Sequence, residues 1–187
     1  MPDSLSDMTR KLYSDLVTLG QELLGWLDNE MPADVRSKMT APLSTMMDKS
    51  EQSLFRILHY PPFCDTAESA AEDSTAIRAA AHEDINLITL LLAGSKPGLE
   101  AQDIEGKWHN VPCDPGMITI NNGDMLSLAT NGFYPSTTHR VVNPERTQNS
   151  ARYSMPMFLH PRPDVALTQG FTADMFLQQR LREIGLK

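Results

Sequence analysis

The sequence predicts a mainly β protein, a sandwich or barrel with flanking helices. Short runs of β-prone residues recur about every eight to twelve residues between positions 54 and 160, and Gly, Pro, Asn or Asp separates them. Near the start, apolar residues recur at three- and four-residue steps, which indicates an amphipathic helix. With 187 residues, the chain is long enough for one such domain and a helical extension.

The first helix is expected between residues 5 and 27. Its apolar stripe consists of Leu5, Met8, Leu12, Leu16, Leu19, Leu23 and Leu27. We expect Ser4 or Ser6 to cap the helix, and residues 29–32, which end in proline, to terminate it. A partner-binding role is an alternative for the stripe, but packing against the β domain explains it more simply.

The next fifty residues or so, up to residue 81, are predicted to contain a short helix, a strand and a loop. Thr40, as a cap ahead of Pro42, predicts a helix that continues to about residue 49. Residues 54–60 predict the first strand, which two prolines then stop. Residues 65–81 are rich in Ala, Glu, Ser and Asp and show no apolar period. We therefore expect a loop there, with room for one helical turn.

The remaining elements follow from apolar runs and turn residues. The run at 85–93 predicts a strand that is buried on both faces. Further strands are expected at 98–102, 107–111, 117–121, 125–129, 137–142 and 153–160. Asn-Gly pairs at 122–123 and 131–132 should supply the positive-φ residues of tight turns. The tail, residues 172–184, predicts a capped helix that ends at Gly185.

Composition excludes several classes of function. The formal charge of −8 and the pI near 5.0 argue against nucleic acid or an anionic membrane surface as partner. No apolar run approaches the ~20 residues of a membrane span, and the first residues lack the features of a secretory signal. Cys64 and Cys113 are too few for a disulfide scaffold or a cysteine zinc site. We expect both as reduced thiols in a cytoplasmic protein.

Two short patterns carry the chemistry. His82 and Asp84 lie two residues apart, which on an extended segment places both side chains on one face. An imidazole and a carboxylate aimed at one point form part of a site for a redox-active divalent metal, and His139 in a later strand can complete it. Arg152 and Ser154 are also two apart and can hold a carboxylate. Taken singly, each histidine is better explained as a hydrogen-bonded core residue; the ordered set favours the metal site.

From about residue 55 to 163, the chain resembles the isopenicillin N synthase-like iron(II)/2-oxoglutarate dioxygenases. The matching motifs occur in that family's order: Leu58-His59-Tyr60-Pro61-Pro62, His82-Glu83-Asp84, Pro97-Gly98-Leu99-Glu100, Gly106-Lys107-Trp108, Asn122-Gly123-Asp124, Thr130-Asn131-Gly132, Thr138-His139-Arg140-Val141 and Arg152-Tyr153-Ser154.

The resemblance implies a fold and a division of the chain. The expected fold is a double-stranded β-helix, also called a jelly roll, preceded by a helical N-terminal segment. Residues 1–50 would form that segment, as a remnant of the family's N-terminal region. Residues 51–165 would form the catalytic domain, and residues 166–187 a C-terminal helix.

The resemblance also implies cofactors and roles. His82, Asp84 and His139 would be the catalytic metal ligands for Fe(II) and would leave three coordination positions open. Arg152 and Ser154 would bind the distal carboxylate of 2-oxoglutarate, and Tyr60 would touch the same carboxylate. The implied reaction uses O2 to hydroxylate or desaturate a small organic substrate, with succinate and CO2 as co-products.

Three departures from the family pattern are visible. Leu58 stands where many plant members carry Asn, so that polar contact is absent. The interval between His139 and Arg152 is a few residues longer than usual, and residues 145–150 can absorb the excess as a loop bulge. The chain begins almost at the long helix, which predicts either a naturally short form or a truncated product. A sheet without its usual flanking strands would be uncovered, so we also expect a homo-oligomer.

Two alternatives stay open at this point. An oxidase of the same fold, such as isopenicillin N synthase itself, uses iron and O2 without 2-oxoglutarate and also carries an Arg-x-Ser pair. A truncated, non-catalytic paralogue would keep the barrel for binding only. The intact His82, Asp84 and His139 set argues against the second alternative, whereas the short N-terminal region argues for it.

Overall fold

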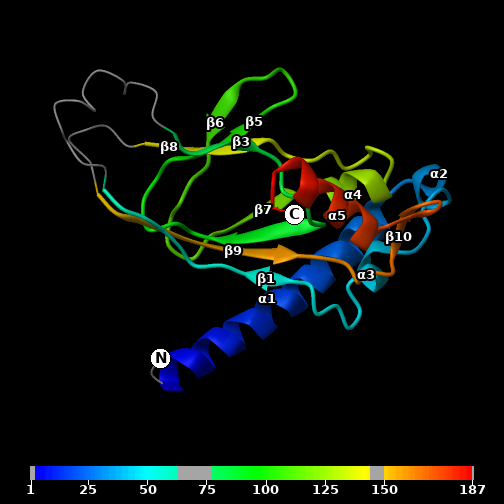
Figure 1. The fold of residues 1–187 in the computed structure, drawn as a ribbon, viewed down its shortest axis with the longest axis horizontal. Helices are drawn as coiled ribbons and strands as arrows, with labels where there is room; N and C mark the ends of the chain where they lie inside the picture. The colour runs from blue at the N-terminus through cyan, green and yellow to red at the C-terminus, as the bar shows by residue number, and fades with distance from the viewer. Residues whose placement is uncertain (1–2, 63–76, 144–149, 187) are drawn as a thin grey trace.

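The computed structural model describes residues 3–62, 77–143 and 150–186. Eleven strands and five helices lie within these ranges. Two antiparallel sheets form the centre of the molecule, and helices cover the outside of the larger one (Figure 1). None of the helices in the described ranges has the length and apolar character needed to cross a membrane.

The larger sheet has the strand order β1-β9-β4-β7, and β2 also pairs with β9. Its strands are β1 (Leu54–Phe55), β2 (Leu58–Tyr60), β4 (Ile88–Leu92), β7 (Ile118–Asn122) and β9 (Arg152–Leu159). The smaller sheet has the order β3-β8-β5-β6, from β3 (Ile77–His82), β5 (Leu99–Gln102), β6 (Trp108–Asn110) and β8 (His139–Val142). Every pairing in both sheets is antiparallel. This arrangement confirms the predicted double-stranded β-helix.

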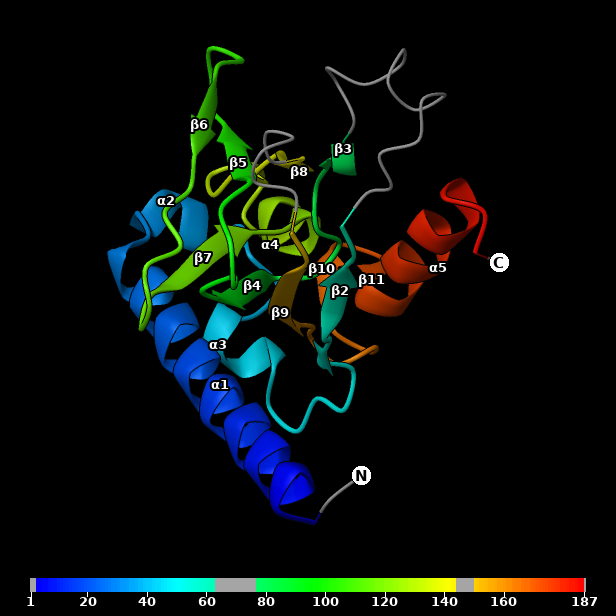
Figure 2. The same ribbon diagram turned by 90° about the vertical axis from the view of Figure 1, so that its left-hand side faces the viewer.

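The long helix α1 (Asp3–Glu30) packs across the outer face of the larger sheet, on the opposite side of the molecule from α5 (Figure 2). Leu16 and Leu24 from its apolar face are buried in the core, which confirms packing as the role of this part of the helix. At Gly20 the approach is close: a Cβ atom there would lie 2.0 Å from Leu159 Cδ1. The predicted cap was wrong, because Ser4 already lies inside the helix.

Two single-turn helices, α2 (Ala33–Arg36) and α3 (Leu43–Met46), follow α1. The predicted Thr40 cap was wrong, since the N-cap position of α3 is Pro42 and the Thr40 hydroxyl donates to Ala166 O. The side chain of Asp28, in α1, caps the N-terminus of α3 instead. Its carboxylate accepts the backbone N–H groups of Leu43 at 2.8 Å and Ser44 at 2.9 Å.

The strand predictions needed three corrections. The single strand expected at 54–60 is two short strands, β1 and β2, with a break at residues 56–57. The part of the predicted loop that the structure describes, from residue 77 onward, is strand β3. The strand expected at 125–129 is helix α4 (Asp124–Ala129). Its apolar residues are buried in either form, so burial alone did not distinguish a short helix from a strand.

The two Asn-Gly pairs also differ from each other. Asn131 and Gly132 have positive φ values of 52° and 79°, as predicted for a tight turn. Gly123 instead has φ −109° and serves as the N-cap of α4. Its small size is required by a close contact with the turn that precedes β4.

The C-terminal segment begins with a small hairpin rather than directly with a helix. Strands β10 (Ala166–Thr168) and β11 (Phe171–Thr172) pair ahead of α5 (Ala173–Glu183). The Thr172 hydroxyl caps α5 by accepting the Met175 N–H at 3.3 Å, and Gly185 follows the helix with φ 74°. The predicted capped helix and its end are therefore confirmed.

Candidate active site

A cavity of about 280 Å³ lies between the two sheets. Side chains from both sheets line it, which places it inside the double-stranded β-helix. Most of its wall is apolar and comes from Leu58, Ala79, Leu91, Leu99, Ala101, Val111, Val141, Pro156 and Phe158. The predicted site residues His82, Asp84, His139, Arg152, Ser154 and Tyr60 all line this one cavity.

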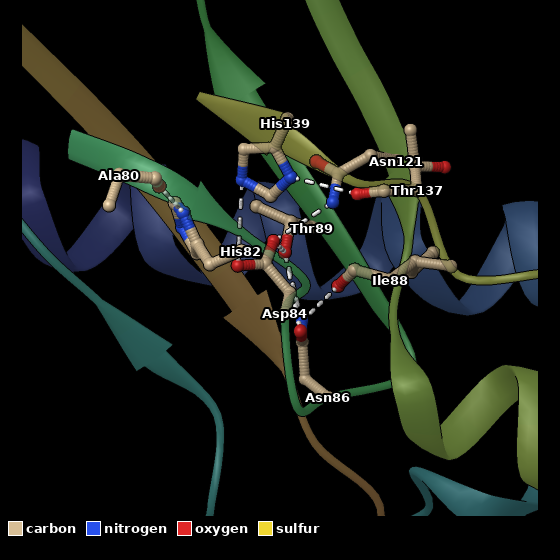
Figure 3. Close-up of polar contacts among 9 residues, drawn as sticks. All are labelled: Ala80, His82, Asp84, Asn86, Ile88, Thr89, Asn121, Thr137 and His139. Atoms are coloured by element: carbon tan, nitrogen blue, oxygen red, sulfur yellow. Dashed lines mark hydrogen bonds and ion pairs between the residues drawn. The ribbon is translucent and has the colours of Figure 1, made fainter. Parts of the chain in front are cut away.

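Three of these residues form a compact group (Figure 3). His82 ends β3, His139 begins β8 directly opposite it, and Asp84 lies in the turn between β3 and β4. One ligand atom from each lies within 4.8 Å of the other two. His139 Nε2 and Asp84 Oδ1 are 3.8 Å apart, which is too far for a hydrogen bond. Both atoms therefore keep lone pairs that a ligand between them can use.

Backbone carbonyl groups orient both imidazoles. His82 Nδ1 lies 2.7 Å from Ala80 O, and His139 Nδ1 lies 2.9 Å from Thr137 O. Because a carbonyl oxygen can only accept, each Nδ1 carries the proton and each Nε2 keeps a free lone pair. Such contacts to the second ring nitrogen are typical of histidines that bind metals.

The carboxylate of Asp84 is held in a similar way. Its Oδ2 accepts hydrogen bonds from the Thr89 hydroxyl at 2.6 Å and from Asn121 Nδ2 at 2.9 Å (Figure 3). Asn86 Nδ2 in turn donates to the Thr89 hydroxyl at 3.1 Å. Asp84 is only 6% exposed, and Oδ1 is the oxygen that remains directed toward His139. The network therefore presents one oxygen of Asp84 to the centre of the group.

The turn that carries Asp84 is braced by the start of α4. Asp124 N–H donates to Asp84 O at 2.7 Å. A Cβ atom at Gly123 would lie 2.2 Å from Asn86 O and 2.9 Å from Asp84 O. Only glycine allows this approach, so the segment predicted as an Asn-Gly turn supports the site through close packing.

Two neutral imidazoles and one carboxylate, directed to one point beside an open cavity, match the chemistry of a non-haem iron(II) site. A structural zinc site would instead be closed by a fourth protein ligand. Among the described residues, no fourth histidine, cysteine or carboxylate belongs to this group. The donor set therefore fits iron(II) with coordination positions left for exogenous ligands.

Arg152 is a buried cation without a counter-ion in the described part of the chain. It is 2% exposed, and its Nε donates to Lys96 O at 3.1 Å, whereas Nη1 is buried without a partner among the described residues. Burial lowers the pKa of the Arg152 guanidinium below its ordinary value. An arginine nevertheless keeps its proton in a protein, so the charge remains. An anion is the ligand that this group lacks.

The surroundings of Arg152 are built to hold it in place. Its guanidinium carbon lies 5.6 Å from the centre of the Tyr60 ring. Ser154, two residues further along β9, is 5% exposed and lines the same cavity. A Cβ atom at Gly94 would lie 2.9 Å from Arg152 Nη2, so glycine leaves the room that the guanidinium occupies.

The other residues singled out from the sequence have different outcomes. Leu58 pairs with Ser154 across β2 and β9 and contributes an apolar side chain to the cavity wall. Cys113 is a free thiol, as predicted. Cys64 and the expected loop bulge at 145–149 lie outside the described residues. Thr89 and Asn121 were missed. Thr89 reaches Asp84 through the turn between β3 and β4, and Asn121 reaches it from β7, which is distant in sequence.

Comparison with known proteins agrees with this geometry. Residues 51–161 match the family model of the 2OG-Fe(II) oxygenase superfamily, and the chain belongs to that superfamily. It is 38% identical over 113 residues to a 2-oxoglutarate-dependent dioxygenase from Didymella fabae, across 60% of this chain and 33% of the relative. It is 36% identical over 170 residues to a 2-oxoglutarate-Fe(II) type oxidoreductase from Aspergillus fumigatus, across 87% of this chain and 46% of the relative.

Solved structures extend the comparison to the whole fold. A candidate oxygenase from Shewanella oneidensis superposes with a TM-score of 0.87 and 47% identity, across all of this chain and 67% of the other. The chain spans about a third to a half of the length of the two fungal relatives. Because the relatives are named for 2-oxoglutarate, they favour the dioxygenase over the oxidase alternative.

Proposed function

We propose that the chain is the catalytic part of an iron(II)- and 2-oxoglutarate-dependent dioxygenase that hydroxylates or desaturates a small organic substrate. The observation that carries the proposal is the buried Arg152, which has no acidic partner among the described residues and lies in the same cavity as the His82, Asp84 and His139 group. A metal-ligand group and an anion-binding group in one pocket suit a co-substrate that has a chelating end and a carboxylate end.

In this proposal His82 and His139 hold iron(II) through Nε2, and Asp84 holds it through Oδ1. The backbone carbonyl groups of Ala80 and Thr137 maintain the required imidazole tautomers. Bound iron(II) supplies, together with 2-oxoglutarate and O2, the oxidation of a C–H bond with release of succinate and CO2. The protein contributes binding, orientation and shielding from water.

Arg152 and Ser154 are proposed to bind the distal carboxylate of 2-oxoglutarate. The planar guanidinium fork matches a carboxylate in two-pronged geometry, and a serine hydroxyl beside it can add a further hydrogen bond. Tyr60 is proposed to complete this end of the cavity, since its ring lies against the Arg152 guanidinium. The apolar wall then remains for the substrate.

The test of this function is succinate formation from 2-oxoglutarate by the iron(II)-loaded protein in air. We expect succinate to appear even without substrate, at the slow rate of uncoupled turnover, and to be absent from Asp84→Ala. Oxygen consumption that needs iron but not 2-oxoglutarate would favour the oxidase alternative. No iron binding would favour the non-catalytic paralogue, which the ordered site argues against.

We also propose that the chain self-associates. Its proposed division is a helical N-terminal segment at 1–50, a catalytic domain at 51–165 and a C-terminal segment at 166–187. Helices α1 to α3 fill the first segment, and β10, β11 and α5 fill the last. Within the described residues β7 ends the larger sheet, and it carries the exposed side chains of Ile118 and Ile120. An unpaired strand edge with apolar side chains favours association.

Light scattering at high protein concentration tests the self-association. The wild-type chain should exceed the mass of a monomer, and Ile120→Lys should shift it toward the monomer because a charge would be placed on the strand edge. Ile104→Lys, at a fully exposed position between β5 and β6, is the matched control and should change nothing. A wild-type monomer would contradict the proposal.

A further inference from the structure

The cavity contains a second arginine, Arg56, that the proposed iron and 2-oxoglutarate sites do not use. It lies at the break between β1 and β2, where its N–H donates to Pro156 O at 3.0 Å. Arg56, Leu58 and Tyr60 all line the cavity, as residues that alternate along an extended segment would. Ile57, between them, is exposed. Arg56 is itself exposed and also lines the cavity, so its side chain lies at the mouth of the cavity, where it meets solvent.

Arg56 and Arg152 lie at different positions along the length of β9, which forms one wall of the cavity. Tyr60 pairs with Arg152 on β9, whereas Arg56 bonds to Pro156, four residues further along that strand. At about 3.4 Å per residue, the two backbone positions differ by about 14 Å. The cavity-lining residues of β9 change over this distance from Arg152 and Ser154 to Pro156 and Phe158. Arg56 thus lies beside the apolar part of the wall.

The charges in the cavity leave Arg56 without a counterpart. Asp84 is the one carboxylate among the described lining residues, beside the two arginines. With iron(II) and 2-oxoglutarate bound, the two positive charges of the metal and that of Arg152 balance Asp84 and the two carboxylates of the co-substrate. The Arg56 guanidinium makes no hydrogen bond or ion pair with any described residue. One positive charge, exposed to solvent at the mouth of the cavity, therefore remains available to a further ligand.

From these observations we infer that Arg56 is a substrate-binding residue and that the substrate is a small monocarboxylic acid with an apolar body. This inference rests on the proposed function. The guanidinium fork of Arg56 binds the carboxylate in two-pronged geometry. Leu58, Leu91, Pro156 and Phe158 contact the hydrocarbon part. The volume of about 280 Å³, shared with 2-oxoglutarate, restricts that part to a small chain or a single ring.

The experiment compares matched carboxylic acids and their primary amides, with short aliphatic or single-ring bodies. Each is titrated anaerobically into the protein loaded with iron(II) and 2-oxoglutarate, by calorimetry and by the metal-to-ligand absorption band. The wild-type protein should bind acids more tightly than the amides of equal shape. Arg56→Gln should weaken acid binding by about 10- to 150-fold and leave amide binding unchanged, because a charge-assisted hydrogen bond is lost.

Arg56→Lys should retain part of the acid preference, since it keeps the charge but not the fork. Arg10→Gln, which removes an exposed arginine on α1, is the charge-matched control and should behave as wild type. The 2-oxoglutarate midpoint, measured in every variant, should stay constant. An acid preference that survives in Arg56→Gln, or a wild-type protein without any acid preference, would overturn the inference. Failure of wild type to bind 2-oxoglutarate would overturn the proposed function as well.

Discussion

At the scale of single residues, the site depends on a few polar side chains whose partners are settled by the fold. Asp84 is buried, yet one of its oxygens has two hydrogen-bond donors and the other faces His139. Arg152 is more deeply buried and lacks an anionic partner within the described residues. Buried charges normally occur paired or as metal ligands, so both groups indicate ligands that bind between the sheets.

Arg152→Ala should weaken 2-oxoglutarate binding strongly and leave iron binding intact. Loss of one partner of a desolvated charge pair costs ~2–5 kcal/mol. At ~1.4 kcal/mol per decade, this corresponds to roughly 30-fold to several thousand-fold in the dissociation constant. The measurement is an anaerobic titration of 2-oxoglutarate into the iron(II) protein. Arg152→Lys should recover only part of the affinity, because the fork is lost.

The control for this titration is Arg182→Ala, which removes an exposed arginine from α5. Its midpoint should equal that of wild type. An unchanged midpoint in Arg152→Ala would show that Arg152 does not bind the distal carboxylate of 2-oxoglutarate. It would then favour the isopenicillin-type oxidase over the dioxygenase.

Thr89→Val should reduce iron(II) affinity by about 10- to 100-fold, the usual effect of losing a group that orients a metal ligand. Valine keeps the shape of threonine but cannot donate to Asp84 Oδ2. The matched control is Thr119→Val, because Thr119 lines the same cavity and has no hydrogen bond to Asp84. Equal iron affinities for the two variants, measured by competition with a chelator, would contradict the positioning role of Thr89.

At the scale of elements, the site depends on how closely α4 approaches the turn between β3 and β4. Gly123 is the N-cap of α4, and Asp124 N–H donates to the carbonyl oxygen of Asp84. The segment was predicted as a strand preceded by a tight turn, and both predictions were wrong. A short, mostly apolar segment such as residues 125–129 fits a buried strand and a buried helix equally well, so only contacts with the turn decide between them.

Gly123→Ala should destabilise the fold by about 1–3 kcal/mol, because the added Cβ would overlap Asn86 O unless the backbone moves. Iron affinity should also fall, since the same movement displaces Asp84. Gly25→Ala is the control within helix α1. Its Cβ would meet nothing within 4 Å, so we expect unchanged or slightly higher stability. Chemical denaturation provides the comparison, and equal losses in both variants would contradict the close-packing explanation.

At the scale of the whole molecule, pH should affect stability through His160, which follows β9. Burial lowers the pKa of His160 below its ordinary value of 6.5, although Phe158 O and Asp84 oppose this effect. Between the lowered pKa and 6.5, the folded protein binds fewer protons than the unfolded chain. The free energy of unfolding should therefore decrease as pH falls below about 6.5.

Thermal unfolding at pH 8 and pH 5.5 tests this effect. His160→Gln removes the titrating group, so the variant should lose less Tm on acidification than the wild-type protein. If both proteins lose Tm equally, another group accounts for the pH dependence.

The cytoplasmic location expected from the sequence stays a prediction.

The sequence alone was enough to predict the fold class, the family and six of the residues that line the cavity, namely Tyr60, His82, Asp84, His139, Arg152 and Ser154. These follow from local patterns: a leucine stripe, regular strand spacing, and short ordered motifs such as Arg152 and Ser154, which lie two apart on one strand. Asp84 differs, because it lies in the turn that follows β3 and not on the same strand as His82. Residues two apart on a strand share a face whatever the rest of the chain does. For this reason Arg152 and Ser154 could be placed on one face of β9 before the fold was known.

The groups that support that site could be identified only from the folded structure. Asn121 contacts Asp84 because β4 and β7 are neighbours, Gly123 is required because α4 touches the turn that carries Asp84, and Arg56 shares a cavity with His139 because two sheets face each other. None of these contacts has a periodicity along the chain, since each joins segments that are far apart in sequence. Such contacts are set by the packing of elements against one another, and that packing is what local patterns do not encode.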